Sequence, residues 1–302
     1  MRLVLAGGLV TTGLIGAAAA EAALRVASFH PLITDLAQQV GGSRLKVEGL
    51  VGPADDPHSF QPTAGDLKRM HGAHLILVSG KGMESYLPKL RSNLGKGQEI
   101  LEVGRKVPSI KIAAGSLFVC CPTHSRGSID PHWWHDPDNM KRAAGILRDA
   151  FTKADPAGAA HYKAHARAAG QRCDALKGWA KRQLSVIPRG DRKLVTAHAA
   201  FGYFCKEFGF RAVPVRGLTR EREPSSKYLA ETIAIMQKER VRAVFPEAAA
   251  NPKVLNEMVR ATGAKLGGRL IADGTGNRAV TTYDAMMRHN VATIVAALRP
   301  GA

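Results

Sequence analysis

The residues best suited to chemistry in this sequence are three histidines and one aspartate, each at a place where a strand is expected to end. They are His58, His132, His198 and Asp273. Ligands of open α/β sheets bind beyond the carboxyl ends of the strands, so side chains in these positions can converge on one ligand. Three neutral imidazoles and one carboxylate match the nitrogen and oxygen donors that zinc prefers. The first hypothesis is therefore a metal site.

The spacing of these four residues matches no local metal motif. Successive positions lie 74 (132 − 58), 66 (198 − 132) and 75 (273 − 198) residues apart, so a shared site requires folding to bring four segments together. Each residue also has an ordinary interpretation: a single histidine at a strand end is often only hydrogen-bonded, and Asp273-Gly274 is typical of a turn. The pattern alone leaves both interpretations open.

Short apolar segments alternate with helical patterns, which is typical of βα units around parallel sheets. Strands are predicted over residues 24–29, 46–51, 74–79, 100–103, 193–197, 211–215, 241–245 and 265–272. Helices are predicted over residues 32–40, 64–71, 84–94, 139–153, 157–186, 199–208, 225–239, 252–262 and 283–298. The helix over 157–186 would be about 45 Å long, which is too long for a crossover and suits a strut between two lobes.

These elements predict an α/β protein of two lobes. Each lobe is expected to hold a mainly parallel sheet flanked by helices, with a long rigid helix joining the lobes and the metal site in the cleft between them. We expect a signal peptide over residues 1–22, an N-terminal α/β lobe over 23–154, a connecting helix over 155–188 and a C-terminal α/β lobe over 189–302. The chain beyond residue 22 exceeds the usual size of one domain.

The N-terminal segment has the layout of a secretory signal peptide. Arg2 precedes an apolar, small-residue stretch over 3–20, and Ala-Glu-Ala-Ala follows at 20–23, where cleavage is expected. A retained membrane anchor needs roughly 20 strongly apolar residues, and glycines and threonines dilute this stretch. The first cysteine is Cys120, so no cysteine is placed for lipid attachment. We expect a soluble periplasmic protein.

The formal charge of +18 does not by itself indicate a nucleic-acid partner. The 43 Lys and Arg residues are scattered, with no long basic run and no basic stretch interleaved with aromatic residues. A basic, monomeric, soluble protein is the expected interpretation. The four cysteines, Cys120, Cys121, Cys173 and Cys205, permit disulfides after export, and their spacing leaves the pairing open, including a bridge between Cys173 and Cys205.

Several longer motifs carry a family resemblance that extends from about Leu24 to Leu298. The motifs are Phe29-His30-Pro31-Leu32, Asp56-Pro57-His58-Ser59-Phe60-Gln61-Pro62-Thr63, Asp130-Pro131-His132-Trp133-Trp134-His135-Asp136-Pro137, His198-Ala199-Ala200-Phe201-Gly202-Tyr203-Phe204, Glu223-Pro224-Ser225, Phe245-Pro246-Glu247 and Ala272-Asp273-Gly274. With these motifs in this order, the chain resembles the metal-specific solute-binding proteins of ABC transporters, known as the cluster A-I or ZnuA/TroA-like family.

The resemblance implies a non-enzymatic function. A protein of this kind captures one metal ion between its lobes and delivers it to an ABC transporter permease, and a periplasmic metallochaperone is a further candidate partner. The family's ligands map onto His58, His132, His198 and Asp273. Members that prefer manganese typically carry Glu where this chain has His198, so the resemblance favours one Zn²⁺ as the bound ion.

The sequence departs from the family pattern in three places. The loop before His132, rich in histidine and acidic residues in many zinc-binding members, is short here and holds only His124. His135 stands where the family usually has an apolar residue, and Asp273-Gly274 replaces the commoner Asp-Pro. His124 and His135, with Cys120 and Cys121, form a candidate capture site, for which an ordinary loop is the alternative.

Two further residues have candidate supporting roles. Trp134 is a candidate for an apolar shell around the metal, and Glu247 is a candidate to hold a ligand imidazole by its second nitrogen or to cap the following helix. Glu247 as a general base defines the main rival, an exported zinc hydrolase, which a fourth protein ligand argues against because catalytic zinc keeps a position open. The other rivals are a manganese or iron carrier of the same fold and an adhesin.

Overall fold

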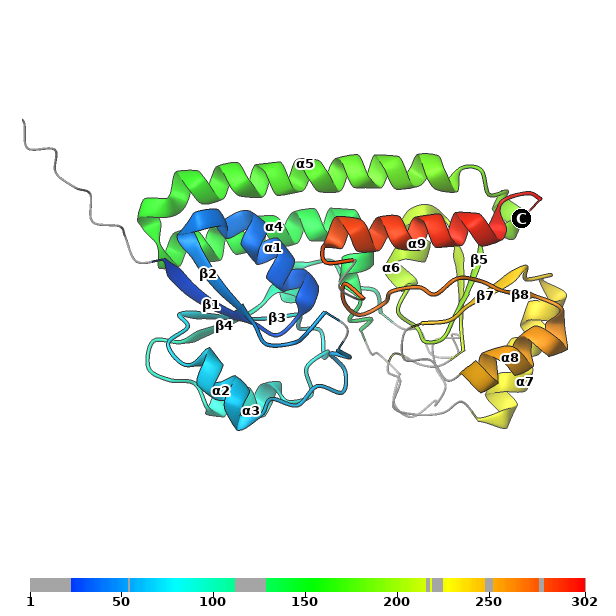
Figure 1. The fold of residues 1–302 in the computed structure, drawn as a ribbon, viewed down its shortest axis with the longest axis horizontal. Coiled ribbons are helices and arrows are strands. Elements are labelled where there is room, and N and C mark those ends of the chain that lie inside the picture. The colour runs from blue at the N-terminus through cyan, green and yellow to red at the C-terminus, as the bar shows by residue number, and fades with distance from the viewer. Residues whose placement is uncertain are drawn as a thin grey trace, which may run out of the picture.

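Two parallel sheets form the framework of the protein. The computed structural model describes residues 23–53, 55–111, 129–215, 218, 225–247, 252–276 and 280–301. The strands are β1 (Leu24–Ser28), β2 (Leu45–Gly49), β3 (Leu75–Val78), β4 (Glu99–Glu102), β5 (Lys193–Thr196), β6 (Arg211–Pro214), β7 (Ala243–Phe245) and β8 (Lys265–Leu266). One sheet has the order β2-β1-β3-β4 and the other β6-β5-β7-β8, so both lobes repeat the same parallel topology (Figure 1).

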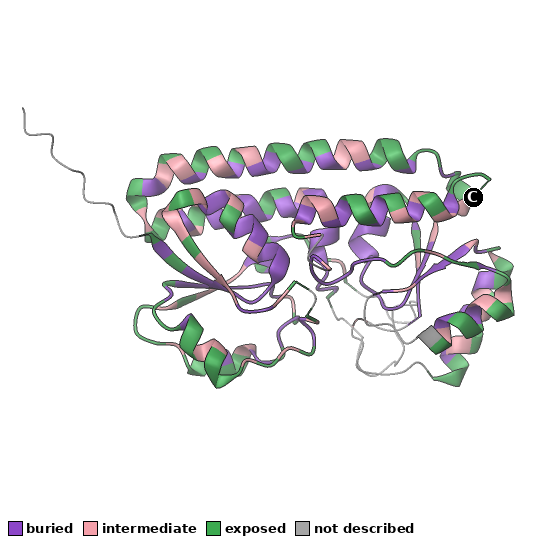
Figure 2. Cartoon of the chain, in the orientation of Figure 1, coloured by how far each residue is buried: buried purple, intermediate pink, exposed green. Residues whose placement is uncertain are grey.

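Helices flank both sheets. They are α1 (Pro31–Gly41), α2 (Ala64–Met70), α3 (Leu87–Ser92), α4 (Pro137–Ala154), α5 (Ala159–Leu184), α6 (Gly202–Phe208), α7 (Ser226–Lys238), α8 (Pro252–Thr262) and α9 (Tyr283–Leu298). All four residues of β3, Leu-Ile-Leu-Val, are buried, because this central strand is covered on both faces. In Figure 2 the inner strands β1, β3, β5 and β7 are mainly buried, whereas the edge strands β2, β4 and β8 and the outer sides of the helices are more exposed.

The longest helix, α5, lies along both lobes (Figure 1). Its 26 residues correspond to about 39 Å. It packs on α4 and α1 of the first lobe and on α9 of the second. The buried side of α5 carries small residues such as Ala166, Ala169 and Gly170, and these let the neighbouring helices approach closely. The expectation of two α/β lobes spanned by a long helix is confirmed.

The two lobes share one hydrophobic core. Its largest cluster runs from Leu24 in β1 to Leu298 in α9, and smaller clusters lie beneath the outer helices of each lobe. Polar contacts join the lobes as well. The Tyr203 hydroxyl accepts the Ile110 N–H at 3.0 Å, and the Asp35 carboxylate accepts the Tyr283 N–H at 2.8 Å, at the start of α9. This shared packing restricts movement of one lobe against the other near α5.

Some predicted elements differ from the structure. The last strand is only Lys265–Leu266 instead of 265–272. The Gly267 N–H still donates to the Val244 carbonyl oxygen at 2.8 Å, and a Cβ at Gly267 would lie 2.8 Å from the Phe245 ring, so this last contact with β7 requires glycine. Helix α6 begins three residues later than predicted, and α3 is limited to Leu87–Ser92, with proline in its first turn. The bridge between Cys173 and Cys205 that the sequence left open is not formed, and both side chains are buried.

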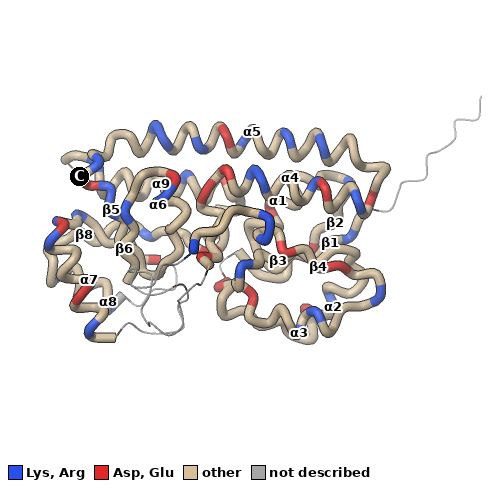
Figure 3. The backbone as a smooth tube through the Cα atoms, turned by 180° about the vertical axis from the view of Figure 1, so that it is seen from behind, with Lys and Arg blue, Asp and Glu red and all other residues tan. Residues whose placement is uncertain are grey.

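Other predictions lie outside the described residues or stay predictions. The signal peptide over 1–22 and the residues Cys120, Cys121 and His124 are not described. The domain boundaries stay predictions. Within the described ranges, no helix combines the length and apolar character that crossing a membrane requires. Figure 3 shows Lys and Arg spread over both lobes and along α5, as the scattered positions in the sequence indicate.

Two glycines give a matched test of the packing. A Cβ at Gly104 would lie 2.4 Å from Trp133 Nε1 and 2.5 Å from the Ser79 carbonyl oxygen, whereas a Cβ at Gly145 in α4 meets nothing within 4 Å. Gly104→Ala should lower the free energy of unfolding by about 1–3 kcal/mol. Gly145→Ala should raise it by about 0.5–1 kcal/mol, because glycine weakens a helix interior. Urea denaturation measures both, and equal effects of the two substitutions would contradict this packing.

Candidate metal centre

Two of the candidate ligands are presented by the same local structure. His58 and His132 each follow an Asp-Pro dipeptide, and in each case the aspartate accepts the histidine's backbone N–H. The distances are 3.0 Å from His58 N to Asp56 Oδ1 and 2.9 Å from His132 N to Asp130 Oδ1. These Asx-type turns stabilise the irregular backbone without regular secondary structure. The repeated Asp-Pro-His sequence thus sets the orientation of both histidines.

The other two candidates come from the second lobe. His198 lies two residues after β5, and its backbone N–H donates to Glu247 Oε1 at 3.2 Å, two residues beyond the end of β7. Asp273 lies in the loop after β8, seven residues beyond its last residue. The sequence-based placement of Asp273 directly at a strand end is therefore wrong, although the loop returns to the same edge through a bridge between Glu247 and Leu270.

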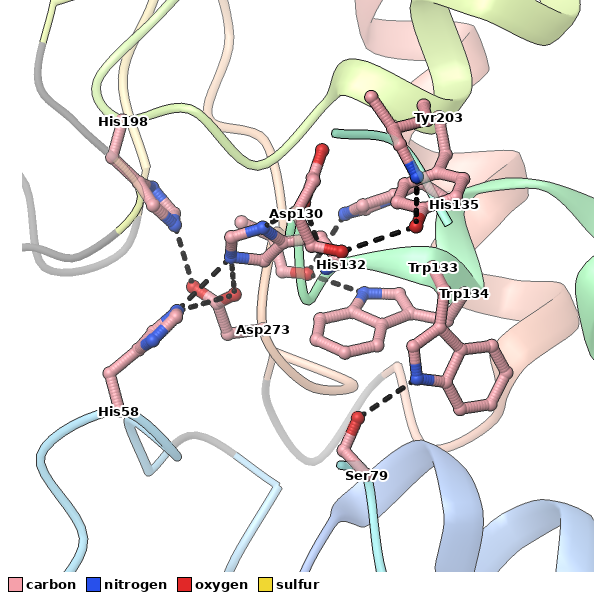
Figure 4. Close-up of polar contacts among 12 residues, drawn as sticks. His58, Ser79, Asp130, His132, Trp133, Trp134, His135, His198, Tyr203 and Asp273 are labelled. Carbon is pink, nitrogen blue, oxygen red and sulfur yellow. Dashed lines mark hydrogen bonds and ion pairs between the residues drawn. The ribbon is translucent and has the colours of Figure 1, made fainter. Parts of the chain in front are cut away.

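The four side chains meet in one buried place between the lobes (Figure 4). His58 Nε2 and His132 Nε2 lie 3.1 Å apart, and both approach Asp273 Oδ1, at 3.5 Å and 3.3 Å. His198 Nε2 lies 3.3 Å from Asp273 Oδ2. His132 and His198 are fully buried, and only 5% of His58 and of Asp273 is exposed. All four candidate ligand atoms lie within 4.8 Å of one another.

These separations fit a metal ion. Zinc bonds of 2.0–2.1 Å to nitrogen place the atoms of a tetrahedral ligand set about 3.4 Å apart. The distances from 3.1 to 3.5 Å described above match that edge length. Four protein donors around one point also fill a tetrahedral coordination sphere. The arrangement can therefore bind an ion tightly and shield it from solvent.

Outer carboxylates orient two of the imidazoles. Asp130 Oδ1 lies 2.8 Å from His132 Nδ1, and Glu247 Oε2 contacts His198 Nδ1. With Nδ1–H donating to a carboxylate, each ring directs the lone pair of its Nε2 towards the cluster. Such carboxylate–histidine pairs fix the tautomer and raise the basicity of a ligand.

The carboxylates in and around the cluster favour positive charge on two of its histidines. Burial disfavours the charged form of His198, but Glu247 and Asp273 outweigh burial and raise the pKa of His198 to about 10. Burial likewise opposes charge on His132, yet Asp130 and Asp273 raise its pKa above the ordinary value. Burial raises the pKa of Asp273, but the surrounding histidines lower it well below its usual range. For His58 burial dominates and lowers the pKa. Without a metal, protons supply the missing charge.

Aromatic rings enclose the cluster. The Trp134 ring lies 5.4 Å from the His132 ring, and Trp133 donates its indole N–H to Ser79 at 3.0 Å. His135 stacks on Phe201 at 4.5 Å and is fully buried, and burial lowers its pKa to about 3. His135 therefore does not lie at the surface, where a capture site needs it. The apolar walls keep water away from the four ligand atoms, which strengthens their interactions with an ion.

Sequence reasoning missed Asp130 as the partner of a candidate ligand. The signal in the sequence is an Asp-Pro-His tripeptide that occurs twice. Its aspartate stands two residues before His58 and again two residues before His132. A second acidic group, Asp136, Asp138 and Glu207, has metal-like spacing but contacts lysines instead. Lys177 Nζ lies 2.6 Å from Asp138 Oδ2 and 2.7 Å from Glu207 Oε1. These contacts give that group an ordinary ion-pair role.

The fold and the cluster define a two-lobed metal-binding solute-binding protein of the kind that serves ABC uptake. Residues 26–297 match the family described as the periplasmic component A of the zinc-uptake complex, ZnuA, and the chain belongs to this family. The family consists of transport proteins.

Similar proteins are named for different metals. The chain is 29% identical over 287 residues to the manganese-binding lipoprotein MntA of Bacillus subtilis, covering 93% of this chain and 91% of MntA. It is 30% identical over 274 residues to the iron-binding protein YfeA of Yersinia pestis, with 89% and 85% covered. The structure of the periplasmic zinc-binding protein TroA of Treponema pallidum is 27% identical and superposes with a TM-score of 0.82, with 92% of this chain and 100% of TroA covered. The comparisons thus support a divalent metal without selecting one.

Metal binding should depend steeply on pH. Because the pKa of His198 in the metal-free protein is about 10, an incoming ion displaces at least one proton throughout the neutral range. The apparent affinity for Zn²⁺ should therefore weaken about tenfold for each unit that the pH falls between 8 and 6. Competition titrations with a chromophoric chelator measure this slope. Titration in weak buffer should show at least one proton released per ion, and an affinity independent of pH would contradict the assignment.

The outer carboxylate Glu247 should tune the site. Glu247→Gln keeps one oxygen that can accept the His198 Nδ1–H, but it removes the negative charge and turns its NH2 group towards the His198 backbone N–H, so metal affinity should fall about 10- to 100-fold. Glu231→Gln, on the exposed face of α7, is the matched control and should leave the affinity unchanged. Chelator competition at constant pH compares the two. Equal affinities of both variants would exclude a supporting role for Glu247.

Proposed function

We propose that the protein is a periplasmic zinc-binding protein that captures one Zn²⁺ and delivers it to the permease of an ABC transporter. The observation that carries the proposal is the convergence of three imidazoles and one carboxylate, with ligand atoms within 4.8 Å of one another, in a buried place between two lobes. His58, His132, His198 and Asp273 are its proposed ligands. Family membership supports the transport role.

The donor set supports zinc over manganese. Imidazole nitrogen suits zinc, while manganese prefers sites richer in carboxylate, carbonyl and water oxygen. Here three of four donors are nitrogen, and His198 is the position where the sequence favours the zinc branch. Because similar proteins are named for manganese and iron, transport of one of those metals is the alternative function.

A zinc hydrolase is a weaker alternative. Catalytic zinc keeps one coordination position for water, whereas four protein donors converge here. Glu247, the candidate base, already contacts His198 Nδ1 and accepts the His198 N–H, so it is used for orientation.

The proposal includes export and release. The N-terminal segment is proposed as a signal peptide cleaved near residues 20–23, giving a soluble monomer in the periplasm that receives zinc directly or from a metallochaperone. Contact with the permease would then favour separation of the two lobes. Because each lobe supplies two of the four ligands, such a separation divides the ligand set and releases the ion.

Cells provide the decisive test of metal identity. Most nitrogen and oxygen sites bind zinc more tightly than manganese, so affinity in vitro does not separate the two functions. Deleting the gene should lower zinc accumulation under zinc limitation, with manganese and iron contents unchanged. The parent gene should restore zinc, and His198→Ala should not, because losing a ligand costs more than the roughly 10- to 100-fold expected for an outer partner. Elemental analysis of the cells measures all three metals, and a selective loss of manganese or iron would overturn the zinc assignment.

A further inference from the structure

The carbonyl oxygen of Ala272, the residue before Asp273, receives two side-chain donors. Trp134 Nε1 donates to it at 2.9 Å and His135 Nε2 at 3.0 Å. Both donors belong to the 3₁₀ turn Trp133–His135, which directly follows His132. A carbonyl oxygen has two lone pairs, so this pair of donors uses its full capacity. The turn after one proposed ligand thus holds the peptide that carries another.

The other end of the Asp273 loop is held by the first lobe as well. The Gly276 N–H donates to the Pro53 carbonyl oxygen at 3.0 Å, and a Cβ at Gly274 would lie 2.7 Å from that same oxygen. Glycine at 274 is therefore required by the close approach of the Pro53 backbone. Residues 272–276 belong to the second lobe by sequence, yet two segments of the first lobe grip them from both ends.

His135 occupies its place at an energetic disadvantage. Its side chain is fully buried, its Nδ1 has no hydrogen-bond partner among the residues that the structure describes, and its ring stacks on Phe201, three residues after His198. A buried polar nitrogen without a partner is costly, and an apolar side chain of similar size would avoid that cost. What His135 contributes in return is the second hydrogen bond to Ala272.

We propose that His135 is a positioning residue that, with Trp134, clasps the Ala272 carbonyl and so holds the Asp273 carboxylate in place for the metal before the metal arrives. The inference rests on the proposed metal-binding function. A loop fixed in advance loses less conformational freedom when the ion binds, and an ion held by a fixed loop leaves more slowly. The clasp also crosses between the lobes, so the lobes cannot separate at Asp273 without breaking it.

The test uses three variants that separate the donor from the ring. His135→Leu removes the N–H donor and places an apolar side chain of similar size in the same site. His135→Gln keeps an N–H that can reach the carbonyl. His161→Leu is the matched control, since His161 Nε2 also contacts a backbone carbonyl, that of Gly41 at 2.9 Å, away from the cluster. If His135→Leu does not fold, His135→Asn replaces it, because its shorter amide does not reach Ala272.

The first measurement uses metal-free protein. Hydrogen exchange of the peptide over residues 270–276 should quicken in His135→Leu, while the peptide over β5 keeps its rate. The second measurement is the rate at which a chelator removes Zn²⁺, which should rise about tenfold or more in His135→Leu, the lower end of the range for outer partners. His135→Gln should restore both values largely, and His161→Leu should change neither.

A double-mutant cycle separates positioning from general support of the fold. In an Asp273→Asn background, His135→Leu should have little further effect on metal release, because the group it positions is already impaired. Unchanged exchange and unchanged zinc release in His135→Leu would overturn the clasp while the parent's metal binding stands. Parent protein that binds no zinc would overturn the proposed function instead, and the exchange measurement on metal-free protein would still decide whether the clasp exists.

Discussion

Electrostatic repulsion inside the buried cluster is the constraint on which the rest of the structure depends. Three imidazole nitrogens and a carboxylate point at the same place, where their lone pairs repel unless a positive charge lies among them. The raised pKa of His198, about 10, expresses that demand. A protein holds such groups together only if other interactions prevent them from turning away. Most of the features around the cluster serve that purpose.

Restraint is applied at two scales. Locally, Asp130 and Glu247 hold His132 and His198 by their Nδ1 atoms, so neither ring can turn its Nε2 from the cluster without breaking a charged hydrogen bond. Globally, one hydrophobic core extends through both lobes, and α5 packs on helices of each. The long helix therefore does more than connect the lobes: beside α5 it restrains them, so any separation of the proposed ligands has to pivot about this packed side.

The sequence carried most of the fold and the identity of the clustered residues, but not their supporting contacts. Alternating apolar and helical segments predicted, in order, the strands and α-helices that the structure describes, because burial periodicity is a local property. The predicted end of the last strand was wrong: regular pairing with β7 stops after Gly267, where the backbone lies close to the Phe245 ring, a contact between distant segments. The order of the motifs indicated His58, His132, His198 and Asp273, which the structure brings together. The contact of Asp130 with His132 and the absence of a bridge between Cys173 and Cys205 depend on the three-dimensional arrangement, so the sequence did not indicate them.

The two departures from the family pattern that the sequence shows at 135 and 274 meet at one loop. Glycine at 274 removes the rigidity that proline would give the residue after Asp273, and it is also the residue that allows Pro53 to approach to within hydrogen-bond reach of Gly276. Histidine at 135 introduces a donor where an apolar residue is usual, and its N–H ends on the carbonyl directly before Asp273. In this chain, the loop around Asp273 is therefore held by contacts with the other lobe instead of by a proline in the loop itself. The difference has a functional consequence, because a covalently rigid loop stays rigid when the lobes separate, whereas a loop held by the opposite lobe is released by that separation.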